Sequence, residues 1–275
     1  MRALETGPKV PPELLSAVLQ YLTFTDLQNA AVCNRLFCDE AERILYEFVI
    51  LDRPGTCEAF LAALQAHGRG ETRRAAVKSL RITDLGDNVR QVRRILKLST
   101  ALVALAVQGG TTGSAQVVPD SEPHPFNLRS FTSFGWIDDG AMTFLASQPS
   151  ITTLNIRRLD PRNAAPLIPN ILPNLTRVSL PVTLISLICQ RPVNAVNTLL
   201  REPSDARLLA DAILESTVPV RELSIVLYTP SISDALSELP SLPEVHTLDI
   251  SVNSLDQTVR TIEFVLIYGI LLKLQ

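Results

Sequence analysis

The stretch Val77-Lys-Ser-Leu80-Arg-Ile82 begins a pattern with apolar residues at its first, fourth and sixth positions, and the chain repeats this pattern. Further copies begin at Leu102, Leu128, Ile151, Leu175, Val196, Val220 and Val245. The intervals between successive copies are 25, 26, 23, 24, 21, 24 and 25 residues, and the copy at Val196 is the weakest. A period of roughly 20 to 29 residues indicates structural units that stack side by side into a solenoid.

Each copy predicts a short strand whose first, fourth and sixth side chains point into a core. The segments that follow carry apolar residues at helical spacing, most clearly in 88–98, 139–146 and 206–214. One repeat cannot close a core by itself, so neighbouring repeats must stack. The sequence therefore predicts an α/β fold with one curved sheet of parallel strands in chain order and with helices on the convex side.

Residues 9–46 precede the repeats and predict three short helices. Pro11 and Pro12 stand where the first helix would begin, a position that favours proline. An apolar stripe follows at helical spacing, formed by Leu14, Leu15, Val18, Leu19 and Leu22. Thr25-Asp26-Leu27-Gln28 has the form of a capping box for the second helix, and the third runs from about 34 to 46. So small a unit buries little apolar surface and usually needs a partner or a neighbouring domain.

The pattern of this segment is that of a known family. Val10-Pro11-Pro12-Glu13-Leu14-Leu15, the Val18-Leu19 pair, Leu22, Asp26-Leu27, Val32-Cys33 and Leu36-Phe37 together resemble an F-box. The repeats resemble a degenerate leucine-rich-repeat array of the kind found behind fungal F-boxes. The resemblance implies two domains, an F-box at 9–46 and a leucine-rich-repeat-like solenoid at 47–275.

The same resemblance implies a function. The F-box would dock the Skp-type adaptor, and through it a cullin, while the repeats bind a target protein for a Skp–cullin–F-box ubiquitin ligase. The residues expected to contact the adaptor are Pro11, Pro12, Leu14, Leu15, Val18, Leu19, Leu22, Leu27, Val32 and Phe37. The alternative is a leucine-rich-repeat scaffold with no ubiquitin role, in which the N-terminal helices only cap the array.

The solenoid departs from a regular repeat at several places. The family favours Asn or Cys at the ninth position, and here only Asn253 matches, so an uneven arc with variable return segments is expected. Residues 47–51 predict a short buried strand, and 57–66 predict a helix. The segment 259–272 is apolar nearly all round. It predicts either a buried capping helix or a chain that stops where another repeat would begin.

Composition excludes several classes of function. A net charge of −3, a pI near 5.7 and the absence of a Lys/Arg run argue against nucleic acid as a partner. The N-terminus has no apolar signal segment, and the longest apolar run, 264–272, is too short to span a bilayer. We therefore expect no membrane association and a cytoplasmic or nuclear location.

The sequence contains no motif for catalysis or for metal binding. The four cysteines and three histidines are scattered, so neither a metal site nor a cofactor is predicted. Asp138-Asp139 is interpreted as a solvated turn, and Gly109-Gly110-Thr111-Thr112-Gly113 lacks the lysine of a phosphate loop. The sequence predicts a binding protein rather than an enzyme.

The open face of the predicted sheet is the expected target surface. The third, fifth and seventh positions of each repeat point away from the core, because side chains alternate along a strand. The candidate target-binding residues on this face are Arg81, Asn155, Arg157, Arg177, Glu222 and Asp249. The basic members come first in the chain and the acidic ones last, which suggests a charge gradient suited to a polar protein segment. The alternative is a row of solvated strand residues with no partner.

Overall fold

A computed structural model of the chain describes residues 11–53, 55–83, 88–108, 124–137, 139–159, 171–227, 244–252, 260–267 and 270–273. The described strands form one sheet, in the order β1 to β11 along the chain. The strands β1 to β9 pair in parallel, each with its neighbour in sequence. The prediction of a curved parallel sheet in chain order is confirmed for these nine strands.

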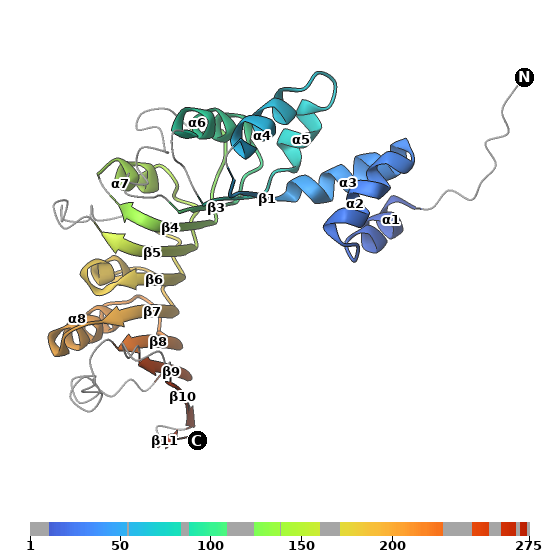
Figure 1. The fold of residues 1–275 in the computed structure, drawn as a ribbon. Helices are drawn as coiled ribbons and strands as arrows, with labels where there is room; N and C mark the ends of the chain where they lie inside the picture. The colour runs from blue at the N-terminus through green and yellow to red at the C-terminus, as the bar shows by residue number, and fades with distance from the viewer. Residues whose placement is uncertain are drawn as a thin grey trace, which may run out of the picture.

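The parallel strands are short, and their bounds follow the predicted copies. They are β1 (Phe48–Leu51), β2 (Ser79–Ile82), β3 (Ala104–Val107), β4 (Ser130–Ile137), β5 (Thr153–Leu159), β6 (Arg177–Pro181), β7 (Ala195–Leu200), β8 (Glu222–Leu227) and β9 (Thr247–Val252). The helices α4 (Thr56–Gln65), α6 (Val89–Leu98), α7 (Asp139–Ala146) and α8 (Pro203–Leu214) follow the outer side of the arc (Figure 1). The predicted helices over 57–66, 88–98, 139–146 and 206–214 are thereby confirmed.

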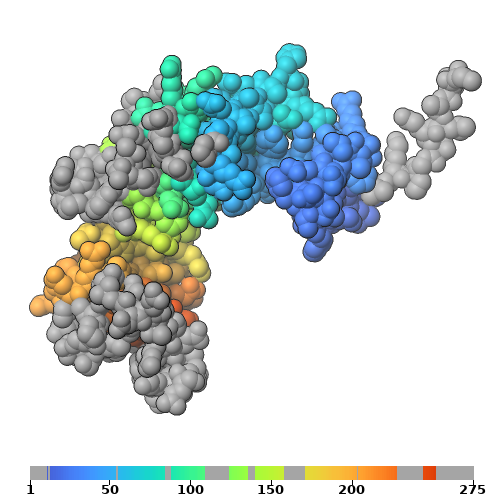
Figure 2. Space-filling view, viewed as in Figure 1, coloured from blue at the N-terminus to red at the C-terminus, as the bar shows by residue number. Residues whose placement is uncertain are grey.

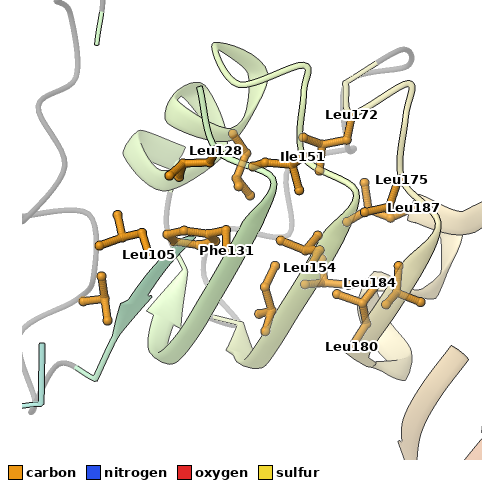
Figure 3. Close-up of a cluster of buried hydrophobic side chains, with 14 of the residues drawn as sticks. Leu105, Leu128, Phe131, Ile151, Leu154, Leu172, Leu175, Leu180, Leu184 and Leu187 are labelled. Carbon is orange, nitrogen blue, oxygen red and sulfur yellow. The ribbon is translucent and has the colours of Figure 1, made fainter. Parts of the chain in front are cut away.

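The core lies between the strands and the return segments. Along β2, β3, β6 and β8 buried side chains alternate with more exposed ones, as the two-residue period of a strand requires. Leu105, Phe131 and Leu154 are aligned by strand pairing and form successive layers of that core (Figure 3). Phe131 also packs edge-on against Phe144 of α7, with 5.6 Å between the ring centroids. The anchors identified in the sequence are therefore the residues that join neighbouring repeats.

Backbone hydrogen bonds also join neighbouring repeats at the residues where the strands begin. The amide of Arg129 donates to the carbonyl of Val103 at 2.8 Å, and the amide of Thr152 donates to the carbonyl of Arg129 at 2.9 Å. The same step recurs from Lys78 to His246, through Val103, Arg129, Thr152, Thr176, Asn194 and Arg221. Each repeat thus satisfies backbone groups of its neighbour, which an isolated repeat would leave to water.

This backbone ladder corrects the register predicted for one repeat. The sequence placed its first and fourth anchors at Val196 and Leu199. In the sheet Val196 pairs with Val178 and Leu223, which are both fourth-position residues. The first position is therefore Val193, which is fully buried, and the buried Thr198 takes the sixth position. The Thr198 hydroxyl donates to the carbonyl of Leu180 at 2.8 Å, which supplies the polar group with a partner.

The return segments differ from one repeat to the next, as the missing ninth-position pattern predicts. After β1 the chain forms α4 and then α5 (Gly70–Ala76), whereas after β6 it forms a 3-10 helix, η4 (Val182–Ile188). The predicted short strand at 47–51 is present as β1, but Phe48 and Ile50 are exposed, and only Leu51 is fully buried. The expectation that this strand is buried is therefore wrong for the face that carries Phe48 and Ile50.

The C-terminal end does not form a helix. The strand β10 (Arg260–Ile267) pairs antiparallel with β9, and β11 (Ile270–Lys273) pairs antiparallel with β10. The prediction of a capping helix over 259–272 is wrong, and the sheet is not parallel throughout. A segment that is apolar nearly all round has no stripe at helical spacing. Its pattern therefore does not distinguish a helix from a strand. The loop at 109–113, Asp138 and Asn253 lie outside the described residues.

The N-terminal residues form a separate small unit of three helices (Figures 1 and 2). They are α1 (Pro12–Leu19), α2 (Phe24–Cys33) and α3 (Arg35–Glu47). The predicted capping box at Thr25 is wrong. Instead Thr23 caps α2, since its hydroxyl accepts a hydrogen bond from the amide of Asp26 at 3.2 Å. Asn34 caps α3 in the same way, through the amide of Phe37. The last residue of α3 is followed directly by the first residue of β1, so this unit has no linker to the solenoid.

A buried guanidinium lies just after η4. Arg191 is only 8% exposed, and it donates to the carbonyls of Ile171, Leu187 and Cys189 at 2.8, 2.6 and 3.1 Å. Burial lowers the pKa of this guanidinium. The residue links the end of η4 to the chain before β6, because its donors satisfy carbonyls that have left regular structure.

We predict that Arg191→Met lowers the free energy of unfolding by about 2 kcal/mol or more, because two buried carbonyls and a partly buried one lose their donor while the side-chain volume is nearly kept. Urea unfolding followed by circular dichroism measures the change. Arg94→Met, at an exposed position on α6, is the matched control and should leave the midpoint almost unchanged. Equal midpoints for the two variants would contradict the role assigned to Arg191.

Candidate interaction surfaces

The apolar residues of α1 divide between the core of the small unit and its surface. Leu15 and Leu19 are buried, at 4% and 1% exposure, and pack with Leu27 of α2. Leu14 and Val18 are 59% and 62% exposed. Adjacent residues on a helix point about 100° apart, so the single stripe read from the sequence is two stripes, of which one faces inward and the other outward.

The same division holds across the whole predicted adaptor surface. Leu15, Leu19 and Leu27 form the core, and Leu22 and Phe37 are partly buried against it. Pro11, Leu14, Val18 and Val32 are exposed, while the side chain of Pro12 lies outside the described residues. Three further exposed apolar residues, Tyr21, Phe24 and Leu36, were not among the expected adaptor contacts, although Leu36 belongs to the F-box-like pattern. Tyr21 continues the outward stripe of Leu14 and Val18 at helical spacing, so the period alone was enough to find it.

The unit is fastened to the solenoid by a cluster of charges between α3 and α5. The Glu42 carboxylate forms ion pairs with the guanidinium groups of Arg73 and Arg69, at N–O distances of 2.8 and 3.0 Å. Burial alone would raise the pKa of Glu42, but the hydrogen bonds from Arg73 and Arg69 outweigh it and lower the pKa. Arg73 also lies over the Tyr46 ring, 5.4 Å from its centroid, and Tyr46 stacks on Phe60 of α4. Cationic, aromatic and apolar contacts therefore all join the two parts.

The open face of the sheet includes two aligned rows of side chains that run from β1 to β9. Strand pairing aligns Phe48, Ser79, Ala104, Ser130, Thr153, Arg177, Ala195, Glu222 and Thr247 in the first row. It aligns Ile50, Arg81, Ala106, Thr132, Asn155, Ser179, Asn197, Ser224 and Asp249 in the second. Five of the six candidate target-binding residues thus lie in these two straight rows, and Arg157 lies two residues beyond Asn155 on β5.

The charged members of this face are not equivalent. Arg177 and Glu222 form an ion pair across β7, at 3.2 Å, which joins residues that the sequence analysis had placed in separate basic and acidic groups. Arg157 lies over the ring of Phe134, 4.7 Å from its centroid. Arg81 is exposed and forms no ion pair within the described part of the chain. The predicted gradient is therefore interrupted near its middle, and its basic end is the freer one.

Two acceptors on the second row are buried without a donor. The Oδ1 atoms of Asn155 and Asp249 have no hydrogen-bond partner among the described residues. The other oxygen of Asp249 is 3.5 Å from the Ser224 hydroxyl, the outer limit of a hydrogen bond. Buried acceptors normally have partners, so these two atoms are exceptions among the described residues of the sheet.

The described ranges hold no cluster of three or more His, Cys, Asp or Glu side chains suited to a metal ion. Within the same ranges no helix reaches the length and apolar character that a membrane span requires. The cysteines in the described part are free thiols. Burial raises the pKa of the Cys57 thiol. Burial also raises the pKa of the Cys189 thiol, to about 11. A thiol with a raised pKa is a poor nucleophile at neutral pH.

We predict that Glu42→Gln destabilises the protein in a pH-dependent way. The folded-state pKa of Glu42 is lowered, so its contribution is fully present above the ordinary glutamate pKa and is lost as the pH falls through the lowered value. The gap in melting temperature between wild type and variant should be largest at neutral pH and should shrink on acidification. Glu58→Gln, an exposed position on α4, is the control. A gap that is constant with pH would contradict the charge cluster.

No protein-family model matches the chain, and no curated protein matches its sequence.

Proposed function

We propose that this protein is a substrate-recognition subunit of a Skp–cullin–F-box ubiquitin ligase. The three-helix unit docks the Skp-type adaptor, and the solenoid binds the protein to be ubiquitylated. The chain supplies binding surfaces, and the transfer of ubiquitin is carried out by other subunits.

The observation that carries the proposal is the outward stripe of α1. Leu14, Val18 and Tyr21 are all more than half exposed, although Leu15 and Leu19 already close the core of the unit. These exposed leucine, valine and tyrosine side chains add little to the buried core of the isolated unit. A contiguous apolar patch of this kind commonly marks a protein interface. The pattern of Pro11-Pro12-Glu13-Leu14-Leu15 and its continuation, which resembles an F-box, says which partner this surface fits.

The direct junction supports the second half of the proposal. The helix α3 continues into β1 without a linker, and the Glu42 cluster holds α3 against α5. A protein that presents a target to a ligase must hold two partners at a defined separation, and this junction provides such a separation. The alternative of a repeat scaffold explains the junction equally well, but it leaves the outward stripe of α1 without a use.

We predict that Leu14→Ala combined with Val18→Ala abolishes co-purification with a Skp-type adaptor. Central apolar anchors of an interface typically cost about 2 kcal/mol or more each when truncated. Because both side chains are exposed, the thermal unfolding of the variant should match that of the wild type.

The matched control is Leu208→Ala combined with Leu214→Ala, which removes two exposed apolar side chains from α8. This control should retain the adaptor. If the α1 variant also retains it while remaining folded, the adaptor does not use this stripe, and the scaffold alternative is favoured.

A further inference from the structure

The first strand of the sheet differs from the others within the two aligned rows of the open face. Along the two aligned rows, β1 to β9, a large apolar side chain occurs only at Phe48 and Ile50. Their exposed fractions are 56% and 45%, and every other position of the rows holds a small, polar or charged residue. Two large apolar side chains on one face of a strand form a patch, whereas scattered single ones are common on any surface.

The charges beside this patch that have no ion pair among the described residues are cationic, whereas the carboxylates of Glu47 and Asp52 each lie within 4.0 Å of a cationic side chain. Arg81 occupies the position next to Ile50 on β2, and Arg129 stands at the start of β4, where it is exposed. Neither has an ion pair among the described residues, whereas Lys78 is held by Glu47 at 3.0 Å. The carboxylates of the two rows are Glu222 and Asp249, which lie on β8 and β9 at the other end of the face.

The strand spacing sets a length for an occupant. Neighbouring strands lie about 4.8 Å apart, so Arg81 is about one strand spacing and Arg129 about 14 Å from β1. An extended chain covers the longer distance in about four residues. The site lies at the corner where α3 meets the sheet, and the molecule is hollowed between the three-helix unit and the strands (Figure 2).

We propose that the N-terminal end of the open face, at Phe48, Ile50 and Arg81, together with Arg129 next to Ser130 of the first row, binds an extended protein segment in which an apolar side chain is followed within about four residues by carboxylates. The apolar side chain packs on Phe48 and Ile50, and the carboxylates pair with the two guanidinium groups. The inference rests on the proposed function, because it names the chemistry of the segment by which a target would be recognised.

The test uses the purified full chain without the adaptor, so that its outcome is independent of α1. Fluorescein-labelled peptides are titrated and followed by anisotropy. One peptide has a leucine directly before a run of glutamates, a second has alanine in place of that leucine, and a third has lysines in place of the glutamates. A fourth carries phosphoserines in place of the glutamates and distinguishes phosphate from carboxylate as the anion. The first peptide should bind at least tenfold more tightly than the second and the third.

Variants of the protein place the peptide on the surface. Arg81→Gln with Arg129→Gln should weaken binding of the first peptide about tenfold, and Phe48→Ser with Ile50→Ser should do so to a similar extent. Arg90→Gln with Arg94→Gln, which removes the same charge from exposed positions on α6, should leave the affinity unchanged.

Three results would overturn the proposal. They are the absence of binding by any peptide, equal binding of the acidic and basic peptides, and equal weakening by the α6 control. Self-association that is abolished by Phe48→Ser with Ile50→Ser would show instead that a second copy of the chain covers the patch. Loss of adaptor binding by α1 variants with intact peptide binding, or the reverse, separates this inference from the proposed function.

Discussion

The structure depends on the bonds that each repeat makes with the next. The amide of every strand-start residue from Val103 to His246 donates to the carbonyl of its counterpart one repeat earlier. The anchors behind this ladder, such as Leu80, Leu105 and Phe131, touch their counterparts in adjacent repeats. A single repeat has neither partner, so the array is stable only as a stack. The order of the strands, the curvature of the sheet and the straight rows on its open face all follow from this requirement.

The two ends of the described sheet differ in structure. At the N-terminal end α3 leads straight into β1, and Glu42, Arg69 and Arg73 fasten α3 to α5. At the C-terminal end β10 and β11 extend the sheet in the antiparallel sense, which no longer requires a return segment. The N-terminal junction gives the protein its two binding surfaces in a defined arrangement, and the exposed apolar residues of α1 and of β1 lie on either side of it.

Much of the solenoid could be predicted from the sequence because its anchors are repetitive. The strands at 77–82, 102–107, 151–156, 220–225 and 245–250 and the helices at 88–98 and 139–146 follow directly from the period. The repeat at β7 was misplaced by three residues, because Thr198 takes an anchor position and a buried hydroxyl does not read as an apolar residue. The strands β10 and β11 were missed because the run 264–272, which joins them, has no polar interruption and therefore shows no period.

The surfaces were harder to predict than the fold. Sequence spacing groups Leu14 with Leu15, although Leu14 faces solvent and Leu15 faces the core. Both are leucines on a helix that is apolar on two faces, so residue type does not show which face is buried. The pairing of Arg177 with Glu222 joins residues 45 positions apart and depends on strand register. The exposure of Phe48 and Ile50 follows from the place of β1 at the edge of the sheet, which no local pattern reveals.

Hydrogen exchange measured by NMR at the strand-start amides tests the stacking of repeats most directly. The side chains of Arg129, Arg221 and His246 are exposed, so only the ladder can protect their amides. The account predicts that these three amides exchange as slowly as those of core residues such as Leu105 and Leu223. Exchange of these amides at the rate of an unfolded chain, with the core amides still protected, would contradict the ladder on which the structure depends.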